Sequence, residues 1–216
     1  MLLKETIGVF KNAFTTEECE ALIKRFEEAK ESGKTWDGNS GGGGVNETLK
    51  ITEDFNLLGS EFPGDDKLEG EVINRFNTIL TDEYLGKYPY LDVYNHHQIS
   101  YGTYYEVLQM QKYIANEGHY NAWHTEKESW GTSRRMFVFI LYLNTVEKGG
   151  KTEFLFKEND EFYGVSPEQG TLLIHPASWP YIHRGEMPYS NDKYILTSWL
   201  SYDPPEMEVV HKFKPY

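Results

Sequence analysis

The segment around His124 and Glu126 brings together two side-chain types that commonly bind metals. Residues two apart on an extended strand point to the same side, so this imidazole and this carboxylate can reach one point in space. His183 offers a third ligand if the fold pairs two distant strands, as antiparallel barrels commonly do. Two histidines and one carboxylate on one face of a metal leave positions open for reactants, an arrangement typical of non-haem Fe(II) sites. These three residues therefore predict a mononuclear iron centre.

Lys193 follows His183 by ten residues and is a candidate anchor for an anion. A keto acid that chelates the metal through one end needs its far carboxylate neutralised. An ammonium group can do this without the fork geometry of an arginine, and a tyrosine hydroxyl is its expected partner. Taken alone, a lysine in the segment 190–193 would be interpreted as an exposed charge. Its offset from the third ligand favours the anchor.

Six sequence features around these residues occur in a fixed order. They are a strand ending in tyrosine (108–113), a glycine-containing turn (118–120), the His-x-Glu pair, an Arg-led apolar strand closing in Tyr-Leu-Asn (135–144), Gly-Gly-Lys-Thr-Glu-Phe (149–154), and a last group formed by 170–174, His183, Lys193 and 197–199. In order and spacing, they resemble the 2-oxoglutarate- and Fe(II)-dependent oxygenases of the prolyl 4-hydroxylase type over about residues 105–202.

The resemblance implies a role for each matched position. It makes His124, Glu126 and His183 the catalytic iron ligands. For 2-oxoglutarate, it places Lys193 and Tyr142 on the distal carboxylate, Tyr113 beside the metal-side carboxylate and Thr197 on the floor of the site. For the substrate, it implies contacts with Arg135 and Trp199. The implied reactants are Fe(II), 2-oxoglutarate as co-substrate and O2, with ascorbate as a candidate reductant.

Glu126 departs from the family pattern, which usually has aspartate at this position. The extra methylene moves the carboxylate outward by about 1.5 Å, the length of one C–C bond. A different rotamer, bidentate coordination or a displaced strand would each absorb that shift. Relatives that halogenate lack the carboxylate altogether, so its presence favours hydroxylation.

Length and composition indicate one domain over residues 1–216. The resemblance implies that this is a single oxygenase domain, with a helical N-terminal support over about 1–90 and a jelly-roll core over about 91–203. The net charge of −13 at pH 7, without a run of lysine or arginine, argues against nucleic acid as a partner. A peptide or protein substrate is expected instead, and the oligomeric state is left open. No apolar run has the length of a signal peptide or a membrane span, so a soluble cytoplasmic protein is expected.

Two amphipathic helices are expected before the barrel. Thr15 and the acids after it begin the first, which ends at Gly33, and an apolar stripe predicts the second over about 66–84. From 104 to 202, short β-type runs alternate with Gly, Pro and Asn turns. The predicted fold is therefore mainly β with flanking helices (α+β), a double-stranded β-helix (jelly-roll, cupin-like) barrel with N-terminal support helices.

Three groups of residues have two interpretations each. The glycine-rich segment 37–46 is either a lid over the substrate or a surface insertion. The tryptophans Trp123, Trp130 and Trp179 are core or rim aromatics, and the core is favoured. The histidines outside the predicted metal site are interpreted as structural or solvated: His96, His97, His119, His175 and His211.

Together these features predict an Fe(II)- and 2-oxoglutarate-dependent dioxygenase that hydroxylates an unactivated C–H bond and releases succinate and CO2. By resemblance, the target is a prolyl residue in a peptide or protein. One alternative keeps the chemistry but changes the substrate to a free amino acid, another peptidyl residue or a small metabolite. A second alternative is a non-catalytic jelly-roll binding module.

Overall fold

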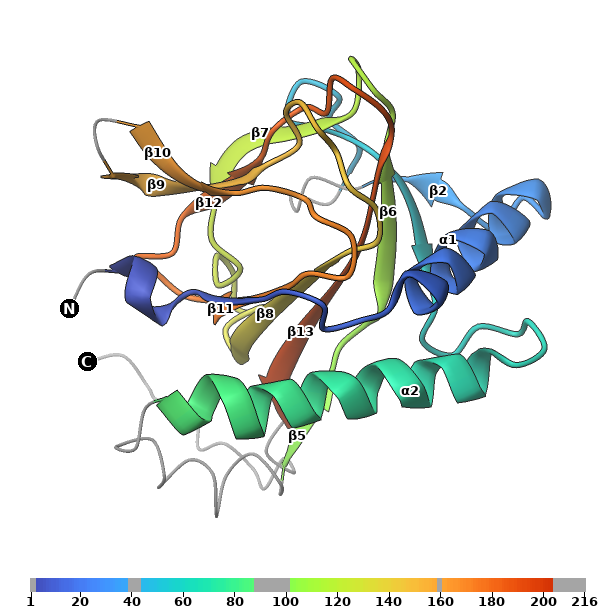
Figure 1. Ribbon diagram of the computed structural model, residues 1–216, viewed down its shortest axis with the longest axis horizontal. Coiled ribbons are helices and arrows are strands. Elements are labelled where there is room, and N and C mark those ends of the chain that lie inside the picture. The colour runs from blue at the N-terminus through green and yellow to red at the C-terminus, as the bar shows by residue number, and fades with distance from the viewer. Residues whose placement is uncertain (1–2, 39–43, 88–101, 159–160, 204–216) are drawn as a thin grey trace, which may run out of the picture.

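The computed structural model describes residues 3–38, 44–87, 102–158 and 161–203, and within these ranges two helices cover a barrel of two antiparallel sheets (Figure 1). The helices are α1 (Thr16–Glu31) and α2 (Asp65–Thr78), which continues as a π-helix (Ile79–Tyr84) and a short 3-10 turn (Leu85–Lys87), and another 3-10 turn (Leu3–Thr6) precedes the first strand. The strands are β1 (Gly8–Phe10), β2 (Trp36–Asp37), β3 (Lys50–Ile51), β4 (Glu53–Asn56), β5 (Thr103–Tyr105), β6 (Gln109–Tyr113), β7 (His119–His124), β8 (Arg135–Tyr142), β9 (Thr152–Glu158), β10 (Glu161–Val165), β11 (Leu172–Pro176), β12 (His183–Gly185) and β13 (Lys193–Tyr202).

The larger sheet has the order β1-β11-β8-β13-β6-β4-β2, with β5 also paired to β13, and the smaller has the order β10-β9-β12-β7-β3. The two sheets face each other as the walls of a double-stranded β-helix, which confirms the expected fold. The N-terminal region was expected to supply support helices. It also supplies four strands, which extend both sheets. Each of these strands has only two to four residues, too few to show a period in the sequence.

Helix α1 begins and ends where the sequence predicts. Thr15 and Glu18 form a reciprocal capping box that satisfies two backbone N–H groups at the start. Gly33, with φ of 66°, follows the last turn in the left-handed conformation that glycine adopts most easily. The buried residues of α1 recur at helical spacing, so one face of the helix packs on the larger sheet.

Helix α2 runs along the outer face of the larger sheet (Figure 1). The ring of Phe76 is fully buried and stacks on Phe139 of β8, with 4.9 Å between centroids. This contact belongs to an apolar layer between the helices and the sheet. A second apolar cluster, which includes Tyr142 and Phe154, lies between the two sheets. The outer layer supports the wall, and the inner cluster fills one part of the barrel beside the cavity.

The structure corrects the preference for a buried position at two tryptophans. Trp130 is 94% exposed and Trp179 is 76% exposed, because each lies on a loop between strands and not on an inward strand position. Trp123 is half-buried and packs beside Phe162 at the barrel rim. His96, His97, His211 and residues 39–43 of the glycine-rich segment lie outside the described residues. Within the described ranges, none of the helices combines the length and apolar character needed to cross a bilayer.

Candidate active site

His124, Glu126 and His183 converge at one end of the smaller sheet. His124 ends β7 and pairs directly with His183, the first residue of β12. The Nε2 atoms of both histidines lie 3.5 Å from Oε1 of Glu126. The backbone N–H of Glu126 donates to the carbonyl of Ala177 at 3.0 Å, which fixes the loop that follows β7. Sequence-distant residues therefore form one compact donor set, with all ligand atoms within 4.8 Å of one another.

The hydrogen bonds of the two imidazoles set which nitrogen is free. Nδ1 of His124 lies 2.9 Å from the carbonyl of Ala122, and Nδ1 of His183 lies 3.1 Å from the carbonyl of Tyr181. A carbonyl only accepts, so in the neutral rings Nδ1 carries the hydrogen and Nε2 keeps its lone pair. Two imidazole nitrogens and one carboxylate oxygen, aimed at each other in a buried place, fit a first-row divalent metal such as Fe(II).

Charge also favours a cation at this point. Burial opposes ionisation of Glu126, but hydrogen bonds to His124 and His183 outweigh it and hold the pKa of the carboxyl well below its usual range. Burial lowers the pKa of His124, and the Glu126 carboxylate more than compensates, so that the pKa is raised. A carboxylate that stays ionised between two histidines is ready to bind a positive ion.

Each of the two histidine ligands packs against another aromatic ring. Tyr120 stacks on His124 with 4.1 Å between ring centroids, and His175 meets His183 edge-on at 4.8 Å. His175 is fully buried, and this burial lowers its pKa to about 3, so the ring is neutral. These ring contacts were not predicted, because no spacing rule connects His175 to His183 and the motif that contains Tyr120 carries no sign of a stacking partner.

The triad opens into a cavity of about 320 Å³ between the sheets. Most of the predicted site residues line it: Tyr113, His124, Glu126, Arg135, His183, Lys193, Thr197 and Trp199. Tyr142 is fully buried beside the cavity, and its hydroxyl donates to Oγ1 of the lining residue Thr152 at 2.8 Å. The hydroxyl of Thr197 donates to the carbonyl of Phe139 at 3.1 Å.

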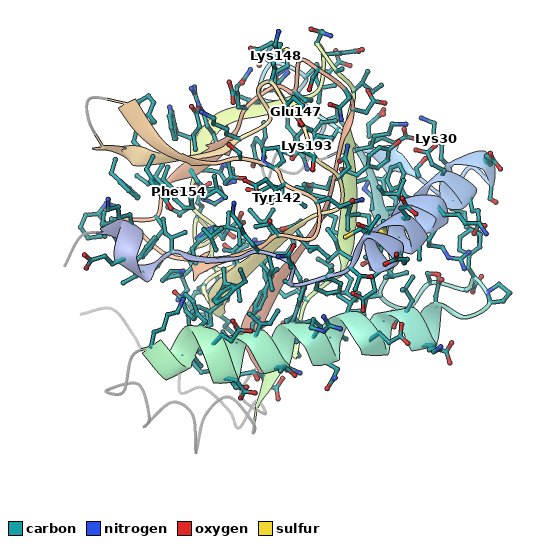
Figure 2. The ribbon with its side chains drawn as sticks, viewed as in Figure 1. Lys30, Tyr142, Glu147, Lys148, Phe154 and Lys193 are labelled. Atoms are coloured by element: carbon teal, nitrogen blue, oxygen red, sulfur yellow. The ribbon has the colours of Figure 1, made fainter. Side chains whose placement is uncertain are left out.

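Lys193 is 1% exposed, and Figure 2 shows it with Tyr142 between the two sheets, whereas Lys148 lies at an outer turn. Its ammonium donates to the carbonyl of Gly150 at 2.8 Å and lies 4.6 Å from the ring centroid of Tyr113. The described residues give it no carboxylate within ion-pair distance. Burial lowers the pKa of Lys193 to about 7, although the charge of Glu186 raises it. A buried cation of this kind is stabilised by an anion entering the cavity.

A polar wall that no motif predicted lies on the same cavity. Asp54 is fully buried, and its Oδ2 accepts from Lys50 at 3.1 Å, from Gln109 at 2.6 Å and from Gln111 at 3.4 Å. Gln111 in turn accepts from the hydroxyl of Tyr113 at 3.1 Å. The wall joins β3 of the smaller sheet to β4 and β6 of the larger, so the ion pair closes the seam between the sheets.

Arg135 contacts the triad directly. Its Nη1 donates to Oε2 of Glu126 at 3.0 Å, and its Nε donates to Glu106 at 2.9 Å. The sequence resemblance placed Arg135 toward the substrate. The structure places its guanidinium on the cavity wall with both neighbouring carboxylates as partners.

Residues 108–201, which include every member of the triad, match the 2OG-Fe(II) oxygenase superfamily. This segment of the chain is thus similar to a 2OG-Fe(II) oxygenase domain. Prolyl 4-hydroxylase 13 of Arabidopsis thaliana is 25% identical over 118 residues, which are 45% of this chain and 43% of the plant protein. The match thus spans less than half of the plant relative.

Solved structures of prolyl hydroxylases share the fold of this chain. A prolyl-4-hydroxylase of Pseudomonas putida superposes with a TM-score of 0.66 at 16% identity, covering 91% of this chain and 92% of the bacterial one. A prolyl hydroxylase of Trichoplax adhaerens, in complex with a peptide of the hypoxia inducible factor oxygen degradation domain, gives a TM-score of 0.70 at 13% identity, covering 91% and 84%. A viral collagen prolyl hydroxylase from Paramecium Bursaria Chlorella virus-1, in its 2OG complex, gives 0.61 at 16% identity, covering 91% and 96%.

Proposed function

We propose that this oxygenase hydroxylates an unactivated C–H bond of a prolyl residue in a peptide or protein, with release of succinate and CO2. The observation that carries the proposal is one cavity holding both a buried His-Glu-His triad and a buried lysine without a carboxylate partner among the described residues. The triad suits Fe(II), and the lysine suits the far carboxylate of 2-oxoglutarate.

In this proposal His124, Glu126 and His183 hold the iron. Lys193 neutralises the distal carboxylate of 2-oxoglutarate, with Tyr142 close by. Tyr113 lies between the lysine and the polar wall, where it would meet the metal-side carboxylate of the co-substrate, and Thr197 lines the cavity and would form part of its floor. When bound, Fe(II) and 2-oxoglutarate supply the oxidative decarboxylation that activates O2 for insertion into the C–H bond.

The protein's own residues bind, orient and exclude water. The carboxylate of Glu126 stays ionised, and the fixed Nδ1 hydrogens keep both Nε2 atoms available. Ile140, Ile195 and Trp199 give the cavity apolar lining that limits access of water to the reaction. Binding of the dianion requires the ammonium form of Lys193, so the lysine holds one proton while the co-substrate is bound.

The prolyl peptide is supported by the curated plant relative, named as a prolyl 4-hydroxylase, and by the Trichoplax protein, which was captured with a peptide. Two exposed tryptophans flank the ligands in sequence, Trp130 after Glu126 and Trp179 before His183. Aromatic surfaces on these loops suit an extended peptide chain better than they suit a small metabolite.

The test is oxidation of a library of proline-containing peptides in the presence of Fe(II), 2-oxoglutarate and ascorbate. The expected product gains one oxygen atom on proline, with one succinate formed for each hydroxylation. His183→Ala should abolish both products, and His119→Ala, a buried histidine outside the triad, should keep them. Oxygen gained on free proline or on another residue, and never on peptidyl proline, would assign a different substrate. Saturable metal binding without any succinate would favour the non-catalytic module.

A further inference from the structure

The two oxygens of the Glu126 carboxylate have different partners. Oε1 lies 3.5 Å from Nε2 of both histidines and faces the centre of the triad. Oε2 accepts a hydrogen bond from Nη1 of Arg135 at 3.0 Å. A charge-assisted bond of this length is among the stronger hydrogen bonds in proteins. One oxygen is therefore directed to the metal position, and the other is already occupied.

Arg135 is itself held on the sides away from Glu126. Its Nε and Nη2 lie 2.9 and 2.8 Å from Oε2 of Glu106, and its guanidinium carbon lies 4.0 Å from the ring centroid of Trp199. The other oxygen of Glu106 accepts from the hydroxyl of Ser201, and its backbone N–H donates to the carbonyl of Trp199 at 3.0 Å. The side chains of Arg135, Glu106 and Glu126 are 16%, 20% and 12% exposed, so water competes weakly with these contacts.

The length of glutamate matters in this arrangement. An aspartate at position 126 would place its carboxylate about 1.5 Å nearer the backbone, the length of one C–C bond. From there the carboxylate would be short of the guanidinium, of the two imidazoles, or of both. Since Oε2 is occupied by Arg135, the glutamate reaches the metal position through one oxygen, without a need for bidentate coordination.

We propose that Glu106 and Arg135 form a clamp that holds Glu126 as a one-oxygen metal ligand, and that this clamp adapts the site to glutamate in place of aspartate. The inference rests on the proposed metal site. Arg135 is then a positioning residue, which acts on the metal through Glu126. Charge supports the same role, because an arginine stays protonated and separates two carboxylates that would otherwise repel each other beside the metal.

A residue that only stabilised the barrel would affect unfolding and leave metal binding to the folded protein unchanged. The test therefore measures the Kd of Co(II) and Mn(II) for anaerobic protein by calorimetry, with the visible spectrum of bound Co(II) and thermal unfolding recorded alongside. Arg135→Gln should raise the Kd of both metals by about 10- to 100-fold, which is the usual effect of removing a residue that hydrogen-bonds to a metal ligand. Arg134→Gln, the neighbouring arginine outside the clamp, is the matched control and should bind as the parent does.

Non-additivity distinguishes the clamp from a general electrostatic effect. Glu126→Asp should weaken Co(II) binding, because the shorter side chain loses the clamp. Adding Arg135→Gln to Glu126→Asp should then weaken Co(II) binding little further. If the two substitutions acted independently, their losses of binding free energy would add. If Arg135→Gln does not fold, Arg135→Lys and Glu106→Gln test the same contacts with smaller changes in volume. Both should weaken Co(II) in the same direction.

The possible failures are distinguishable. Parent-like metal affinity in folded Arg135→Gln, or fully additive losses in the double variant, would overturn the clamp and leave the iron site standing. Absence of saturable Co(II) and Mn(II) binding by the unmodified protein would overturn the proposed function, and the clamp with it.

Discussion

The phenol ring of Tyr120 lies parallel to the imidazole of His124, with 4.1 Å between ring centroids and 18° between the planes. The two residues lie four apart on β7, and side chains at this spacing share a face of a strand. The stack restricts rotation of the imidazole about its bond to the backbone. It therefore preserves the direction of Nε2 toward Glu126 when no metal is bound.

We expect Tyr120→Ala to weaken binding of Mn(II), because His124 gains rotational freedom. An aromatic pair contributes about 0.5–1.5 kcal/mol beyond burial, which corresponds to about a 2- to 13-fold rise in Kd. Tyr120→Phe keeps the ring and should keep the affinity. Calorimetric titration of Mn(II) into the three proteins measures the difference, and equal Kd values for the alanine and phenylalanine variants would show that the stack has no such role.

Lys193 predicts a pH dependence for 2-oxoglutarate binding. With a pKa of about 7 in the free protein, the lysine is increasingly neutral above that pH. The dianion binds the ammonium form, so binding above pH 7 takes up a proton and the apparent Kd should rise about tenfold for each pH unit. Calorimetry in two buffers of different ionisation enthalpy measures the proton uptake. Lys193→Arg stays protonated and should lose the pH slope, whereas a flat profile in the unmodified protein would contradict the assignment.

Lys193 should also make the stability of the protein depend on pH. As pH rises, 2-oxoglutarate binding should weaken, whereas the free energy of unfolding of the protein without 2-oxoglutarate should increase. The folded pKa of Lys193 is lowered to about 7, and an unfolded lysine has a pKa of about 10.4, so between these values the unfolded chain holds the extra proton. The contribution of Lys193 to stability therefore rises as pH increases through this window, and the burial cost is complete below it. Urea unfolding of the protein and of Lys193→Met from pH 6 to pH 10 isolates this term. The exposed Lys148→Met should run parallel to the unmodified protein.

The ion pair of Lys50 and Asp54 should matter mainly for stability. Both side chains are almost fully buried, at 4% and 0% exposure. Lys50→Met removes the partner of a buried carboxylate and should cost about 3–5 kcal/mol in the free energy of unfolding. The double variant Lys50→Met, Asp54→Leu removes the charge as well and should recover part of that loss. Urea unfolding measures all three, and a double variant less stable than Lys50→Met would show that the glutamine contacts of Asp54 dominate.

The triad could be predicted from the sequence because one part of it is local and the rest belongs to a series of motifs that resembles a known family. His124 and Glu126 are two apart on a strand, and His183 and Lys193 keep their spacing in a recognisable series of motifs. The capping box of α1 is equally local. Physical rules that act over a few residues are visible in a single sequence.

Contacts that join distant segments were not predictable in this way. Glu106 precedes its partner Arg135 by 29 positions, and Asp54 meets Gln109 across 55 positions, with no spacing rule to connect either pair. Strands β2 and β3 have two residues each, and they exist because longer strands already present free edges to them. The outward positions of Trp130 and Trp179 also depend on how the loops leave the barrel.

Phe76 tests whether the helical layer supports the wall without shaping the site. The ring is fully buried in the layer between α2 and the larger sheet. It is not one of the residues that line the cavity. Phe76→Ala should lower the free energy of unfolding by about 3–5 kcal/mol through lost burial and a residual void. Metal affinity of the molecules that remain folded should be unchanged, because the ring partners of Phe76 are Phe14, Tyr105 and Phe139, which lie outside the triad. Asn74→Ala, at an exposed position of α2, is the control for changes in helix propensity. Weakened Mn(II) binding by folded Phe76→Ala would show that the outer layer also sets the geometry of the site.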